Sequence, residues 1–177
     1  MQKKSNGFSL LEILITVSLL LIIASFAVAN FSFFDKFLLN AETSKLFSVL
    51  TYQQQKAIAS GKQKQMQINI EKNCFIFDEN GKNIVEKLND KVIFGFIPDA
   101  KGPPSSPTKP ITSAITFAKE NENFVIKFAP DGKINCGTIY LTSKNKKFMA
   151  AISTPISQVS LLRKYVYKVG RWELIRN

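Results

Sequence analysis

An apolar run near the N-terminus constrains this chain more than any other feature of its sequence. A short leader with lysines gives way at Phe8 to apolar residues that continue to Phe34, and Glu12 is the only charge among them. As a helix that rises about 1.5 Å per residue, the uncharged residues 13–34 would cross the roughly 30 Å hydrocarbon core of a bilayer. We therefore expect a membrane helix whose N-terminus is cytoplasmic, because the lysines precede it.

A secretory signal peptide is the alternative interpretation of the same segment. Ala27, Val28 and Ala29 form a small-residue cleavage pattern ahead of Asn30, behind a basic start. Glu12 argues against a removable signal, because an ionisable residue in lipid is costly unless it has a partner. This carboxylate is therefore a candidate functional residue.

The residues around Glu12 match a known pattern. The sequence GFSLLE at residues 7–12 resembles the class III leader of type IV prepilins and type II secretion pseudopilins. The resemblance implies that a prepilin peptidase cleaves between Gly7 and Phe8, that the new amine of Phe8 is methylated, and that Glu12 acts in filament assembly. A carboxylate near a helix N-terminus is favoured by the helix dipole. The free amine of a neighbouring subunit's Phe8 could neutralise Glu12 and set the axial register of packed helices.

The helical pattern continues beyond the apolar run. Apolar residues recur near helical spacing at Leu39, Leu46, Phe47, Leu50, Ala57 and Ile58. Gly61, which follows them, is typical of a helix end. We expect one helix over residues 8–60, with Asn30 and Asp35 as points of bending.

From residue 65 onward the period of the apolar residues changes to two, which is typical of strands. The predicted strands cover residues 66–70, 74–77, 91–97, 114–118, 124–129, 137–142, 148–153, 161–167 and 171–175. Turns are predicted at Asn80-Gly81, Asp131-Gly132 and Val169-Gly170. Residues 99–110 contain four prolines and should form an exposed loop.

Within the superfamily, the soluble part is similar to the GspH/FimT family of minor pseudopilins and minor pilins. The residues that carry this likeness are Leu46, Leu50, Gln54, Ala57, Ile58 and Gly61, and then Ile126, Phe128, Pro130, Asp131, Gly132, Gly137, Thr138 and Ile139. The resemblance implies an α+β, pilin-like fold, in which a long N-terminal α-helix packs on a C-terminal antiparallel β-sheet domain. The implied divisions are a leader at 1–7, a transmembrane or filament-spine helix at 8–34, its amphipathic continuation at 35–61, and a periplasmic β-rich domain at 62–177.

The two cysteines, Cys74 and Cys136, fall in predicted strands on the oxidising side of the membrane. A disulfide between them would close a loop of about 60 residues and contribute about 4 kcal/mol. The alternative is two buried free thiols that act as small apolar side chains. The sequence leaves both open.

The net charge of +11 is concentrated toward the C-terminus. Candidate contacts to DNA or another anion are Arg163, Lys164, Lys168, Arg171 and Arg176, with Trp172 as a stacking residue. FimT-like minor pilins bind DNA through a Gly-Arg-x-Arg motif, but here Glu173 stands in place of the second arginine. The alternative is that Trp172 packs on its neighbours while the charges face solvent.

The composition argues against an enzyme. The chain has no histidine, and we find no serine-nucleophile motif, phosphate-binding glycine loop or metal-ligating cluster in it. Asp131 and Gly132 are typical of a turn rather than a calcium loop, because Pro130, Lys133 and Ile134 supply no further ligands. We expect neither a cofactor nor a metal.

The sequence therefore predicts a structural subunit of the bacterial inner membrane with a periplasmic β domain. As a GspH-like minor pseudopilin it would join a type II secretion pseudopilus, and the alternative is a FimT-like minor type IV pilin that acts in pilus assembly or DNA uptake. The implied partners are a prepilin peptidase, other pseudopilins or pilins, an inner-membrane assembly platform and secreted cargo. DNA is the least favoured partner.

Overall fold

The computed structural model describes residues 9–29, 31–79, 81–103, 105–154 and 161–175. The chain divides into two units, Met1–Phe34 and Asp35–Asn177. Its helices are α1 (Leu10–Ala29) and α2 (Phe31–Ser60). The sequence predicted one helix over residues 8–60; the structure describes helix on both sides of Asn30, which is itself outside the described residues.

The predicted membrane helix over residues 13–34 stays a prediction, because it includes Asn30, which lies outside the described residues. Among the described residues, no helix has the length and apolar character needed to cross a membrane.

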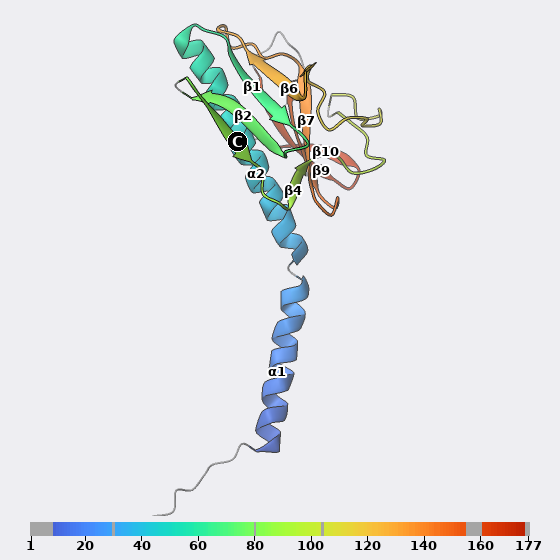
Figure 1. The fold of residues 1–177 in the computed structure, drawn as a ribbon. Helices are drawn as coiled ribbons and strands as arrows, with labels where there is room; N and C mark the ends of the chain where they lie inside the picture. The colour runs from blue at the N-terminus through green and yellow to red at the C-terminus, as the bar shows by residue number, and fades with distance from the viewer. Residues whose placement is uncertain (1–8, 30, 80, 104, 155–160, 176–177) are drawn as a thin grey trace, which may run out of the picture. The chain divides into compact units, whose positions relative to one another are not determined.

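The strands form two five-stranded antiparallel sheets (Figure 1). The first has the order β3-β2-β1-β6-β5, with strands Lys82–Lys87, Cys74–Glu79, Lys64–Asn69, Asn123–Phe128 and Lys119–Glu120. The second has the order β10-β9-β8-β7-β4, with strands Arg171–Ile175, Arg163–Lys168, Met149–Thr154, Gly137–Ser143 and Val92–Phe94. The predicted α+β fold is confirmed, since a helix is followed by an antiparallel β domain.

Eight of the predicted strands are present, with ends that differ by three residues or fewer. The strand predicted over residues 114–118 is wrong: Ile115 makes a single bridge with Ile139, and Phe117 lies so close to Gly137 that an added Cβ would be 2.6 Å from its ring. The sequence missed β3 and the two-residue β5, which are edge strands rich in charged residues.

One core lies between α2 and the two sheets. Leu39, Leu46, Leu50 and Ala57 form the buried stripe of α2, as the helical spacing predicted. They pack with side chains from both sheets, including Phe75, Phe77, Ile126, Phe128, Ile139, Leu141 and Ile152. Figure 1 shows α2 running beside β1 and β2. Gly61 ends the helix with a φ of 61°, as predicted.

A second cluster covers the outer face of the second sheet. Tyr140, Met149 and Ala151 pack there against Ala100 and Ile111. Residues 99–110 form the predicted loop, which is exposed for most of its length. Its base is buried and closed by a hydrogen bond of 2.8 Å from Gly102 N to Lys109 O. Strands β7 and β8 are therefore covered on both faces.

The predicted turns lie where the sequence placed them. Gly132 N donates to Ala129 O at 2.9 Å, and Asp131 forms an ion pair with Lys133 at 2.6 Å. Lys168 pairs with Arg171 across the turn at Val169-Gly170. In the β2–β3 hairpin Gly81 has a φ of 82°, while Asn80 is outside the described residues.

The two cysteines are free thiols, so the structure contains no disulfide between them. Cys74 is buried on β2, whereas Cys136 is exposed and precedes β7 rather than lying in a strand. Asn135, the neighbour of Cys136, bonds to Val125 and Lys127 on β6, and β1 lies between β6 and β2. Strands two positions apart are about 9.6 Å from each other, which exceeds the reach of a disulfide. The alternative of two buried thiols holds for Cys74 alone.

Candidate functional site

The predicted cleavage and methylation residues, Gly7 and Phe8, lie outside the described residues. Helix α1 begins at Leu10, two residues later than predicted. The backbone N–H groups of Glu12 and Ile13 donate to Ser9 O at 2.9 and 3.2 Å. Ser9 therefore stands at the N-cap, and Ser9 and Glu12 have the S-x-x-E spacing of a capping box. The spacing of Ser9 and Glu12 would have indicated this helix start from the sequence, but the prediction did not use it.

Apolar side chains are exposed on every side of α1 over residues 10–25, where its side chains are described. Large side chains along it are exposed within the chain, including Leu10 at 81% and Leu21 at 67%. Its hydroxyl groups are satisfied inside the helix: Thr16 donates to Ile13 O, Ser18 to Leu14 O and Ser25 to Ile22 O. Glu12 is the only ionisable side chain of α1. A helix that is apolar all round is normally buried.

The basic residues predicted to contact an anion do not converge on one surface. Arg163 opens β9, while Lys168 and Arg171 face each other at the closed end of the β9–β10 hairpin. At about 3.3 Å per residue, five steps along β9 separate the two ends by about 17 Å. Arg163 also points to the opposite face from Lys164 and Lys168, because side chains alternate along a strand. Arg176 lies outside the described residues.

Two of these lysines already have partners. Lys164 Nζ donates to Ser44 Oγ at 3.2 Å and lies 5.6 Å from the ring centre of Phe47, so it is fastened to α2. Lys168 forms an ion pair with Glu173, the acidic residue that replaces the second arginine of the DNA-binding motif. Arg163 and Arg171 are exposed.

Trp172 is held in place by its neighbours. Its indole Nε1 donates to Lys101 O at 2.8 Å, and its ring packs on Tyr167 and Tyr140 at centroid distances of 4.9 and 5.8 Å. The burial of Tyr140 raises the pKa of its hydroxyl, so this cluster is neutral at physiological pH. Trp172 acts here as a packing residue, in agreement with the alternative left open by the sequence.

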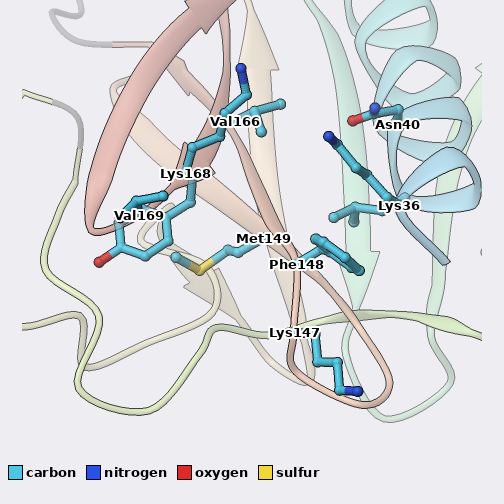
Figure 2. Close-up of a pocket in the computed structure, with 10 residues that line it drawn as sticks. Lys36, Asn40, Lys147, Phe148, Met149, Val166, Lys168 and Val169 are labelled. Atoms are coloured by element: carbon cyan, nitrogen blue, oxygen red, sulfur yellow. The ribbon is translucent and has the colours of Figure 1, made fainter. Parts of the chain in front are cut away.

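A pocket of about 240 Å³ adjoins the closed end of the hairpin. Figure 2 shows three lysines around it: Lys36 from α2, Lys147 from the β7–β8 turn and Lys168 from β9. Its apolar lining includes Leu39 and Phe148. The sequence missed Lys36 and Lys147, because only the fold brings these distant segments to Lys168.

In the described part of the chain, no group of three or more histidine, cysteine, aspartate or glutamate side chains could hold a metal ion. The two candidate sites are therefore the carboxylate of Glu12 on α1 and the lysine-lined pocket on the β domain. Among the described residues, neither feature brings together a nucleophile and a general base.

Comparisons with known proteins bear on the N-terminal segment. Residues 2–28 match the prokaryotic N-terminal methylation motif. This match supports the superfamily predicted from the leader, that of the type IV pilins and type II secretion pseudopilins. Its members are structural subunits, and the motif implies processing by a prepilin peptidase and assembly with other pilin-like subunits.

Among solved structures, the chain is similar to the minor pseudopilin EpsH from the Type 2 Secretion System of Vibrio cholerae. The two have a TM-score of 0.46 and 9% sequence identity, over 77% of this chain and 95% of that chain. No curated protein sequence matches this chain significantly.

Proposed function

We propose that this protein is a GspH-like minor pseudopilin, a structural subunit of a type II secretion pseudopilus. The observation that carries the proposal is α1 itself, a helix that exposes apolar side chains all round over residues 10–25 and has one carboxylate three residues from its N-cap. The methylation motif at residues 2–28 supports it. The same helix would serve a FimT-like minor type IV pilin, and the two machines are distinguished by which one fails when the gene is removed.

The proposed mechanism is assembly through α1. Before assembly the chain resides in the inner membrane, with its N-terminus cytoplasmic and residues 35–177 in the periplasm. After cleavage between Gly7 and Phe8, the methylated amine of Phe8 on one subunit lies against Glu12 of its neighbour. Removing one member of such a buried pair strands the other charge, at a cost of about 3 to 5 kcal/mol. Glu12 therefore selects one axial register among the many that apolar helices allow.

The β domain supplies the outward surface in this proposal. Its core is complete within Asp35–Asn177, so it can remain folded while α1 moves from the membrane into the filament. The contacts it would offer are to other pseudopilins, to the inner-membrane assembly platform and to secreted cargo.

The central test replaces Glu12 with glutamine, which keeps the shape of the side chain and removes its charge. Coexpressed with its secretion machine, Glu12→Gln should leave the β domain folded while incorporation into sheared filaments falls at least about a hundredfold, as expected for a cost of about 3 kcal/mol. Glu71→Gln is the matched control, because Glu71 is an exposed glutamate outside α1. Normal incorporation of the Glu12 variant would overturn the assembly role.

Processing has its own measurement, the intact mass of protein purified from membranes that contain a prepilin peptidase. We expect a chain that lacks residues 1–7 and carries one added methyl group. A chain that begins at Asn30 would instead establish the signal-peptide interpretation.

A further inference from the structure

The lysine-rimmed pocket combines positive charge with an apolar lining. Lys36, Lys147 and Lys168 contribute three cationic side chains, while Leu39, Phe148 and Val166 contribute apolar surface. No carboxylate lines the pocket; Glu173 reaches only Lys168. An arrangement of cations around an apolar lining fits an anionic amphiphile better than it fits a free inorganic ion.

The tip of the β9–β10 hairpin adds a second, independent observation. Val169 lines the pocket, is fully exposed, and has a φ of 44°. A β-branched residue in this left-handed region is strained, and the turn favours asparagine, aspartate or glycine there. Strain of this kind is typical of positions with a function. An exposed apolar tip between Lys168 and Arg171 is suited to the boundary between lipid headgroups and acyl chains.

The pocket also lies at the end of the β domain where the N-terminal segment attaches. Lys36 follows Phe34, the last residue of the apolar run, by two positions, which is at most about 7 Å of extended chain. The β7–β8 turn is tied to the same place, because Asn145 Nδ2 donates to Asp35 Oδ2 at 2.7 Å. If the apolar run is anchored in a membrane, this short connection keeps Lys36 near the membrane surface.

We propose that the pocket formed by Lys36, Lys147 and Lys168 binds the headgroup of an anionic phospholipid, with Val169 entering the interface beside it. The proposal rests on the membrane anchoring put forward above. Before assembly, this contact holds the β domain against the membrane, and entry into the filament requires its release.

Native mass spectrometry of the full chain in detergent micelles tests this directly. The probes are dioleoylphosphatidylglycerol, dioleoylphosphatidylcholine and inorganic phosphate. We expect phosphatidylglycerol to bind at least about tenfold more tightly than phosphatidylcholine. The variant Lys36→Gln/Lys147→Gln should weaken phosphatidylglycerol binding about 25-fold, because each basic residue near an anionic lipid surface contributes about a fivefold change.

The matched control is Lys62→Gln/Lys82→Gln, which removes the same charge from exposed positions outside the pocket. It should bind phosphatidylglycerol as the parent chain does. Equal weakening by the two double variants, equal affinity for the two lipids, or phosphate that competes as well as lipid would each overturn the proposal.

The variant Val169→Asn should change thermal stability and lipid affinity in opposite directions. Relief of the strained φ should raise the thermal midpoint, while loss of the apolar tip should weaken phosphatidylglycerol binding. Val85→Asn, at an exposed valine on β3 outside the pocket, is the control that leaves binding unchanged. Unchanged lipid affinity in Val169→Asn would show that the Val169 side chain does not contribute to lipid binding.

The measurement separates this inference from the proposed function. Binding in micelles requires neither cleavage nor filament assembly, so a failure of Glu12→Gln to disturb assembly would leave lipid binding intact. Conversely, a chain that assembles normally but shows no preference for phosphatidylglycerol would refute the pocket alone.

Discussion

Cys74 and Cys136 have opposite environments, and this difference is measurable. Cys74 is 2% exposed, whereas Cys136 is exposed on the surface. A maleimide added to the native protein should therefore modify one thiol, and after unfolding it should modify two. Intact mass counts the additions, and Cys136→Ser should abolish the native one. Two additions to the native chain, or none to the unfolded chain without reductant, would contradict the structure.

Asp78 makes stability depend on pH. Lys64 Nζ donates a hydrogen bond of 2.9 Å to its carboxylate, which holds the pKa of Asp78 below its ordinary value of 3.8. A carboxyl group with a lowered folded-state pKa stabilises the fold above the unfolded pKa and loses this contribution as pH falls through the folded value. We expect the stabilisation to be present at pH 5 and to disappear below about pH 3.8.

Denaturant unfolding at pH 6 and at pH 2.5 checks this expectation. Asp78→Asn should lower the free energy of unfolding at pH 6 and change it less at pH 2.5, because the stabilisation by the charged carboxylate diminishes as the pH falls. Asp90→Asn is the control, because Asp90 is exposed and has no ion pair in the described part of the chain. An equal loss at both pH values would show that the effect is not one of charge.

At the scale of elements, Trp172 fastens β10 to the proline-containing loop through its bond to Lys101 O. Trp172→Phe should cost about 1 kcal/mol of unfolding free energy, since it removes one hydrogen bond and keeps an aromatic ring. Hydrogen exchange should accelerate most at the base of the loop, at Gly102 and Ile111. Tyr52→Phe, at an exposed tyrosine on α2, should change neither quantity. Uniform acceleration across the domain would contradict this local role.

The helices and most strands could be predicted because their signals are local. The buried stripe of α2 appears in the sequence as apolar residues at helical spacing, and Gly61 marks its end. Strand β3 escaped prediction because an edge strand exposes Lys82, Asn83 and Lys87 and needs little apolar alternation. Residues 114–118 alternate like a strand, but Phe117 packs against Gly137 and only Ile115 bridges to β7.

At the scale of the whole molecule, the core of the β domain requires nothing from residues 1–34. All of its buried apolar residues lie within Asp35–Asn177. A chain of residues 35–177 should therefore fold, with an unfolding free energy within about 1 kcal/mol of the full chain in detergent. It should also be soluble without detergent, because the exposed apolar surface of α1 is removed.

Denaturant unfolding followed by circular dichroism checks the truncated chain. A single cooperative transition is expected. Loss of cooperativity would show that the N-terminal segment takes part in the core, against the division into two units.

The candidate sites differ in how far the sequence alone could reveal them. The leader could be read from residues 7–12 because its signal is contiguous, and the methylation motif supports that interpretation. The lysine pocket could not, because Lys36 is more than a hundred residues from Lys147 and Lys168 in the sequence and only the fold brings them to one pocket. The cysteine alternatives could be decided only from the strand order.

Helix α2 is joined to the β domain by directional bonds as well as by apolar contact. Asn145 bonds to Asp35, Lys164 to Ser44, and the buried Gln53 and Gln54 reach Asp78 O and Gly132 O at 3.2 and 2.7 Å. These attachments extend over about 28 Å of helix. A force along the helix axis would load all of these hydrogen bonds in shear. Tension applied at the N-terminal end of α2 would therefore be distributed over both sheets before any single strand separates from its neighbours.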